Sequence, residues 1–119
     1  MLEATAFAVR HNLEAFTDSG LAIERVRAVG GGAGASLWPR IVSDVTGLVQ
    51  QIPAETVGAA YGDAALAAEA IDRPSADWAR VIEEIEPDRR DIYEARYASY
   101  RQLYDSTRSI IHQLPGAER

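Results

Sequence analysis

Hydrophobic residues recur at helical spacing at the start of the chain. Five of them lie three or four positions apart: Leu2, Ala6, Val9, Leu13 and Phe16. Polar side chains occupy the positions between them, so the segment predicts an amphipathic helix that ends at the stop signal Ser19-Gly20. Residues 23–29 then mix β-branched side chains with arginines and lead directly into three glycines, which is typical of a short strand followed by a loop.

The next two segments repeat this alternation of helix and strand. Residues 37–46 predict a helix whose apolar stripe contains Leu37, Ile41 and Val45. Three residues agree with this prediction. Ser36 can cap the helix, Pro39 lies in its first turn, and Gly47 follows its end. Residues 48–52 predict a second strand, which a proline closes.

Helices are also predicted for most of the second half of the chain. Residues 56–71 are dominated by alanine, and we expect a buried helix there because small side chains let another backbone approach closely. One more short helix is predicted around the apolar residues Trp78, Val81, Ile82 and Ile85. Residues 88–113 predict a long amphipathic helix with tyrosines at alternating steps of four and three: Tyr93, Tyr97, Tyr100 and Tyr104.

The resulting order is helix, strand, helix, strand, helix, helix, which predicts the α/β class. Two successive strands joined through a helix pair in parallel. Parallel sheets seldom contain only two strands, and residues 54–119 offer no convincing third one. Such a segment either dimerises through its exposed strand edge or belongs to a larger protein. We favour the second explanation and expect the missing strands upstream of Met1.

Composition narrows the range of functions. The 119 residues fit one domain, and 47% hydrophobic with 25% charged residues is typical of a globular chain. The net charge of -6 argues against nucleic acid or an anionic membrane as partner. All 12 basic residues are arginines, so a lysine-containing P-loop is excluded. Cysteine is absent, and neither a membrane-spanning run nor a signal peptide is present, so we expect a cytoplasmic protein.

Residues 30–36 form a glycine-rich loop between a predicted strand and a predicted helix. Backbone amides left bare by glycine, together with the start of the following helix, can hold a phosphate or the polar edge of a nucleotide. The same residues could instead make only a tight turn with Ser36 as the helix cap. Gly30, Gly32 and Ala35 also satisfy the dinucleotide pattern G-x-G-x-x-[GA], with Glu55 downstream as a possible ribose ligand.

A longer combination of motifs resembles the C-terminal part of the FGGY family of carbohydrate kinases. The combination consists of Val-Arg-Ala-Val-Gly-Gly-Gly-Ala at 26–33, Leu37-Trp38, Ser-Asp-Val-Thr-Gly-Leu at 43–48, and Gly-Ala-Ala-Tyr-Gly-Asp-Ala-Ala-Leu-Ala-Ala at 58–68. The resemblance begins near Glu3 and runs into the tyrosine-rich helix, so it covers nearly the whole chain. Among members of the family, the segment looks most like xylulokinases.

The resemblance implies a fold, an activity and site residues. The fold would be the C-terminal part of an actin-like, RNase H-like ATPase domain, with short parallel strands, packed helices and a long C-terminal helix. The activity would be transfer of the γ-phosphoryl group of ATP to a sugar hydroxyl, with Mg²⁺ as cofactor and D-xylulose as the expected sugar. Residues 1–119 would be a single nucleotide-binding segment without the N-terminal sugar-binding domain, and inactive alone.

In this segment the resemblance implies a backbone contact to adenosine at Gly31 and Gly32. The small side chain of Ala33 would leave room for the adenosine at that wall of the site. Ser36 would offer its side chain to the adenine edge. Family members more often read Gly-Gly-Gly-Ala-Lys-Ser-Pro-Leu-Trp-Arg here, so Gly34, Ala35, Ser36 and Pro39 depart from the pattern. The backbone contact does not depend on those side chains.

The tyrosine face supports an alternative of another class, a dimerising helical module without a nucleotide. Tyrosine suits a helix that lies across a domain surface better than a coiled-coil seam, so we favour packing within the domain, with a homodimer left open. We expect Asp44 to act structurally through the backbone or Arg40, and Trp38 to anchor the core. The acidic residues Glu83, Glu84, Glu86 and Asp88 could hold Mg²⁺, but we interpret them as solvated charge beside a helix start. His11 and His112 are assigned no chemistry.

Overall fold

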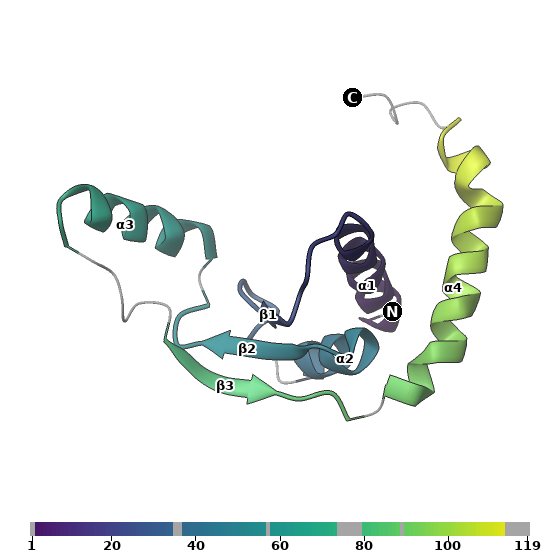
Figure 1. The fold of residues 1–119 in the computed structure, drawn as a ribbon, viewed down its shortest axis with the longest axis horizontal. Coiled ribbons are helices and arrows are strands. Elements are labelled where there is room, and N and C mark those ends of the chain that lie inside the picture. The colour runs from purple at the N-terminus through teal and green to yellow at the C-terminus, as the bar shows by residue number, and fades with distance from the viewer. Residues whose placement is uncertain (1, 35–36, 57, 74–79, 89, 114–119) are drawn as a thin grey trace.

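The chain folds into helices and a small sheet over the residues that the computed structural model describes, which are 2–34, 37–56, 58–73, 80–88 and 90–113. Seven elements follow one another along these residues: α1 (Leu2–Asp18), β1 (Arg25–Arg27), α2 (Leu37–Thr46), β2 (Val49–Pro53), α3 (Gly58–Ala70), β3 (Val81–Ile85) and α4 (Arg90–Ile111). Figure 1 shows α1 and α2 beside the sheet, α4 running along them, and α3 apart from the other helices.

The sheet has the strand order β1-β2-β3. β1 pairs in parallel with β2, with Arg25 opposite Val49, so the predicted parallel pairing through α2 is confirmed. β1 is shorter than the predicted range 23–29, since only three residues have strand geometry. The α/β fold class is therefore correct, although the sheet as a whole is mixed.

The third strand corrects the prediction for residues 78–85. Val81–Ile85 is a strand, not a helix, and it pairs antiparallel with β2, with Gln50 opposite Ile85. Trp78 lies outside the described residues. Val81, Ile82 and Ile85 have a spacing that also fits one face of a helix, but β-branched side chains favour a strand where a partner edge is present. The open edge of β2 supplies that partner, so the prediction that residues 54–119 hold no third strand was wrong.

The alanine-rich helix α3 corrects a second prediction. Only Ala68 is buried on it, whereas Leu66 is 72% exposed. α3 also packs against no other helix or strand among the residues that the structure describes. The prediction of a buried helix was wrong because small side chains permit a close backbone approach but do not supply the partner.

The core lies between α1, α2 and α4. Its buried members are Ala6, Phe7, Val42, Val45 and Tyr97, and the half-buried side chains of Val9, Trp38, Ile41, Tyr93 and Tyr100 pack against them. The ring of Phe7 lies 5.8 Å from that of Tyr97 and 5.7 Å from that of Tyr100. The part of the tyrosine face that contains Tyr93, Tyr97 and Tyr100 thus packs within the domain, as expected, whereas Tyr104 and Ile111 are exposed.

A polar cluster joins α1 to α4 at the border of this core. The Arg10 guanidinium donates to Glu14 at 3.0 Å and to both carboxylate oxygens of Glu94 at 3.0 Å each. It also donates to the carbonyl of Val45 on α2 and lies 4.0 Å above the ring of Tyr97. We call Arg10, Glu14, Glu94, Tyr97 and Arg101 the α1–α4 polar cluster.

Glu14 accepts hydrogen bonds from three members of this cluster. Its carboxylate receives the hydroxyl of Tyr97 and the guanidinium groups of Arg10 and Arg101. Burial alone would raise the pKa of Glu14, but the hydrogen bonds from Tyr97 and Arg10 and the two arginine charges outweigh it and hold the pKa below its ordinary value. The ionised carboxylate is therefore more stable in the folded chain than in the unfolded one.

Asp44 connects α2 to the start of α4. Its side chain is buried, with a relative exposure of 4%, and its Oδ1 atom accepts a hydrogen bond of 2.8 Å from the backbone N–H of Asp88. The expected structural role is confirmed. The backbone partner, however, lies 44 positions further along the chain.

We expect the stabilising contribution of Glu14 to disappear in acid. Because its folded pKa is lowered, this contribution is present above the ordinary value of 4.5 and is lost as the pH falls through the folded pKa. Glu14→Gln should lower the free energy of unfolding by about 1–2 kcal/mol at pH 7, and the difference should shrink below that ordinary value. Urea unfolding from pH 7 to pH 3 measures both. Glu3→Gln is the control, since Glu3 pairs with Arg96 on the surface; an equal loss in both variants would contradict the prediction.

Removal of the Asp44 carboxylate should destabilise the junction of α2 and α4. Asp44→Ala leaves the Asp88 N–H without this acceptor, and the expected loss in unfolding free energy is about 1–3 kcal/mol. Asp44→Asn keeps an acceptor oxygen and should lose less. Glu83→Ala, at an exposed carboxylate on β3, is the control and should unfold like the unmodified chain. If Asp44→Asn lowers the unfolding free energy as much as Asp44→Ala does, the hydrogen bond to Asp88 is not the reason why Asp44 stabilises the fold.

Candidate functional site

The glycine-rich turn lies at the edge of the sheet where β1 and β2 both end. The Ala28 N–H donates to the carbonyl of Gln51 at 2.9 Å, which extends the parallel pairing beyond β1. The Gly30 N–H then donates to the carbonyl of Thr56, just after β2. Because parallel strands end at the same edge, these two bonds fix the start of the turn beside residues 54–56. This edge is where open α/β sheets bind ligands.

The turn itself places two exposed glycines at its centre. The Ala33 N–H donates to the Gly30 carbonyl at 3.0 Å, so Gly31 and Gly32 occupy the two middle positions. Gly30 has φ +92°, a left-handed conformation that side chains disfavour. Among the described residues, the N–H groups of Gly31 and Gly32 have no hydrogen-bond acceptor. The turn can therefore offer two free amides to a ligand.

Two hollows adjoin the turn. The first, which we call the sheet-edge hollow, has a volume of about 340 Å³ and is lined by Ala33, Gly34, Ile52, Pro53, Ala54, Thr56, Ile82, Glu83 and Ile85. The second, the Trp38 hollow, has about 450 Å³ and is lined by Leu2, Thr5, Gly32, Leu37 and Trp38. Both volumes fall within the range of small-molecule sites.

The predicted site residues are divided between these hollows. Ala33 is buried and lines the sheet-edge hollow, whereas Gly32 lines the Trp38 hollow. Gly31 is exposed. Ser36 lies outside the described residues. Trp38 lines the same hollow as Gly32, and a β-carbon at Gly32 would be 3.0 Å from its Cδ1. The sequence singled out both residues but did not predict that they lie together.

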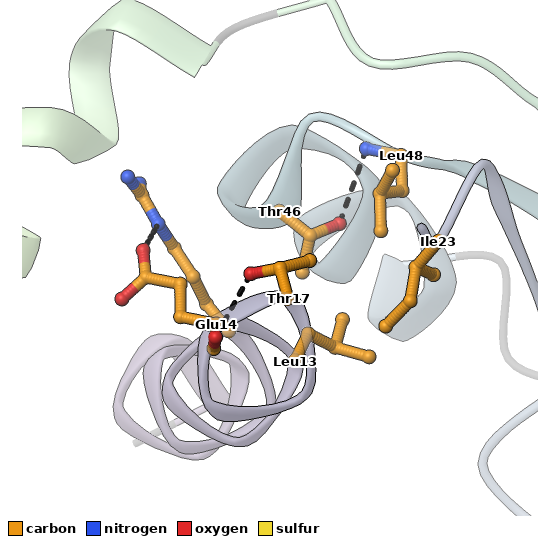
Figure 2. Close-up of a pocket in the computed structure, with 7 residues that line it drawn as sticks. Leu13, Glu14, Thr17, Ile23, Thr46 and Leu48 are labelled. Carbon is orange, nitrogen blue, oxygen red and sulfur yellow. Dashed lines mark hydrogen bonds and ion pairs between the residues drawn. The ribbon is translucent and has the colours of Figure 1, made fainter. Parts of the chain in front are cut away.

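A further pocket between the ends of α1 and α2 offers no free polar group. It has about 200 Å³ and is lined by Arg10, Leu13, Glu14, Thr17, Ile23, Thr46 and Leu48. Figure 2 shows the Thr17 hydroxyl, which donates to the Glu14 carbonyl, and the Thr46 hydroxyl oxygen, which accepts from the Leu48 N–H. Arg10 and Glu14 are paired in the α1–α4 polar cluster. We assign no ligand to this pocket.

In the part of the chain that the structure describes, the acidic residues around β3 and the histidine of α1 show no arrangement that indicates catalysis or metal binding. The Glu84 carboxylate accepts a hydrogen bond of 2.6 Å from the amide of Gln51, and Glu83 and Glu86 are exposed. The imidazole of His11 packs against the rings of Tyr100 and Tyr104. Within the described ranges, no three His, Cys, Asp or Glu side chains gather as metal ligands. In the same part of the chain, no helix has the length and apolar character to cross a membrane.

The dinucleotide-binding interpretation does not agree with the sheet. That fold requires further β-α-β units with parallel strands after the second strand. The strand that follows β2 in the described chain is β3, and it is antiparallel. Gly30, Gly32 and Ala35 therefore match the fingerprint by spacing alone.

Comparison with known proteins identifies the family. Residues 1–71 match the C-terminal domain of the FGGY family of carbohydrate kinases. The ribulokinase of Mycolicibacterium smegmatis is 37% identical over 114 residues, which cover 88% of this chain and 20% of that protein. A xylulose kinase of Haemophilus influenzae is 38% identical over 45 residues, which cover 38% of this chain and 9% of that protein.

A solved structure supports the same assignment. The crystal structure of xylulose kinase from Rhodospirillum rubrum superposes with a TM-score of 0.74 at 30% identity, covering 94% of this chain and 24% of that one. The expected fold, the C-terminal part of an actin-like ATPase domain, is thereby confirmed. This chain spans about a fifth of the length of the ribulokinase that it matches. On these grounds the chain belongs to the FGGY family of carbohydrate kinases, and its residues 1–71 correspond to the C-terminal domain of the members.

Proposed function

We propose that this chain forms the adenosine-side wall of the ATP site in a cytoplasmic sugar kinase. The observation that carries the proposal is the glycine turn itself, which presents the amides of Gly31 and Gly32 at the edge where two parallel strands end. Ligands of open α/β sheets bind at that edge, and glycine N–H groups can donate to a nucleotide without interference from side chains. Membership of the FGGY family supports ATP as the nucleotide.

The roles of the turn residues follow from their positions. Gly31 and Gly32 place backbone against the adenosine, and the small side chain of Ala33 leaves the sheet-edge hollow open. Ser36 offers its hydroxyl either to the adenine edge or to the start of α2 as a cap. The amides without an acceptor fit the polar edge of a nucleotide.

Phosphoryl transfer needs groups that we place in the rest of the kinase. It requires a base that activates the acceptor hydroxyl and metal ligands that hold Mg²⁺ at the phosphates. We assign neither to the described residues of this chain, in which Asp44 is committed to the backbone of Asp88. When bound, Mg²⁺ would neutralise charge on the transferred phosphate. The segment of 119 residues alone is therefore expected to be inactive.

The proposed acceptor is a ketopentose. D-Xylulose is the sugar that the resemblance implies, and the name of the Rhodospirillum rubrum neighbour agrees with it. Ribulose is the alternative, because the Mycolicibacterium smegmatis relative is a ribulokinase. The sugar pocket belongs, in this proposal, to a domain outside these residues.

Gly32→Val in the full-length kinase should abolish ATP binding. A β-carbon at Gly32 would lie 3.0 Å from Cδ1 of Trp38, so a branched side chain forces the turn out of place. Isothermal titration with a non-hydrolysable ATP analogue measures the effect. Gly62→Ala is the control, since a β-carbon there meets nothing within 4 Å. Unchanged affinity in the valine variant would refute the placement of the nucleotide at this turn.

The full-length kinase should release ADP in the presence of D-xylulose and Mg²⁺. A coupled ADP assay with D-xylulose, D-ribulose and L-ribulose identifies the acceptor, because a site built for one sugar rejects an epimer that leaves its polar groups unpaired. Faster turnover with a ribulose would reassign the sugar while keeping the kinase. No ADP release with any of the three, together with dimerisation that ignores ATP analogues, would favour an interaction module instead.

A further inference from the structure

The indole of Trp38 lies beside the place that a side chain at position 32 would occupy. A β-carbon built on Gly32 would be 3.0 Å from Cδ1 and 3.4 Å from Nε1 of Trp38. Built β-carbons at Gly31 and Gly34 meet nothing within 4 Å. The pyrrole edge of the indole therefore supports the turn at one point, the second of its two central residues.

Trp38 has little freedom to withdraw from this contact. It lies in the first turn of α2, next to the buried Pro39, and it packs against the core cluster that contains Phe7, Val42 and Tyr97. Protein cores are close-packed, so the indole cannot move further toward these neighbours without displacing them, although its other side lines the Trp38 hollow. The core cluster therefore limits how far the indole can move away from Gly32.

The backbone of the turn is fixed at its ends but not at its centre. Gly30 is held by the carbonyl of Thr56, and Ala33 is held by the carbonyl of Gly30. Among the described residues, no hydrogen bond holds the amides of Gly31 and Gly32. Trp38 is the side chain that lies nearest to Gly32 on the side where a β-carbon would point.

We propose that Trp38 is a positioning residue for the nucleotide. Its indole determines how far the amides of Gly31 and Gly32 lie from the core. Position 32 requires glycine because a side chain there would collide with the indole, not because it would collide with the nucleotide. The proposal rests on the proposed function, because it assumes that ATP binds at this turn. It connects the nucleotide contact to the packing of α1 and α4.

A double-mutant cycle in the full-length kinase tests the proposal. Gly32→Ala should raise KM for ATP about tenfold, because the new methyl group pushes the turn away from the indole. Trp38→Val removes the ring atoms that the methyl group would meet, and should itself raise KM for ATP because the support is lost. In the Trp38→Val background, Gly32→Ala should add little, so the two effects should be strongly non-additive. KM for the sugar should change in none of these variants.

A core control separates positioning from general destabilisation. Ile41→Ala lies on the same helix and removes a side chain that packs against the same cluster. It should lower the melting temperature while KM for ATP stays unchanged, whereas Trp38→Val should change both. If Trp38→Val does not fold, Trp38→Ile provides the second arm of the cycle, since it keeps more apolar volume in the core but has no ring atom beside Gly32.

The outcomes distinguish this proposal from the one on which it rests. An equal effect of Gly32→Ala in both backgrounds would show that the methyl group meets the nucleotide itself and would overturn the role of Trp38. A wild-type KM for ATP in the Trp38→Val variant would overturn it as well. If the unmodified kinase binds no ATP analogue, the proposed function fails and the role of Trp38 fails with it.

Discussion

The parallel pairing of β1 with β2 is the constraint on which the arrangement of the candidate site depends. Two parallel neighbours cannot be joined by a hairpin, so the chain must cross back through a helix, here α2. The crossing requires a turn directly after β1, and it brings the end of β2 to the same edge. The glycine turn, the carbonyl of Thr56 and the sheet-edge hollow therefore come together although Thr56 lies 22 positions after Gly34 along the chain. The same helix carries Trp38 back against the turn and Asp44 toward α4.

Much of this architecture could be predicted from the sequence because local signals agreed with it. The helices α1, α2 and α4 have apolar stripes at regular spacing, and serine, proline and glycine mark the ends of α2. α3 and β3 were harder for a physical reason. Burial of α3 depends on a partner that its alanines do not specify, and the pattern of Val81, Ile82 and Ile85 fits a helix as well as a strand. In both segments tertiary context, not local preference, decides the structure.

The candidate site also has features that the sequence predicts and features that depend on tertiary context. The free amides of Gly31 and Gly32 could be anticipated, because glycines between a strand and a helix are typical of ligand-binding turns. The distribution of Gly32 and Ala33 over two hollows could not, since it depends on where the indole of Trp38 lies. The predicted structural role of Asp44 was correct, but its partner Asp88 could not be found from spacing, because the bond joins segments that are distant in the chain. The sequence pattern therefore did not predict which distant segments lie close together in the fold.

The α1–α4 polar cluster has a consequence for the order of folding. The bond between Arg10 and Glu94 joins residues 84 positions apart, whereas β1, α2 and β2 are consecutive. Closing so long a loop costs more chain entropy than forming the neighbouring crossover unit. The crossover unit can therefore assemble first, and α4 completes the domain by closing over a scaffold that already exists. In the reverse direction, departure of α4 would remove Tyr97 and Tyr100 from the ring of Phe7 and expose that part of the core to water.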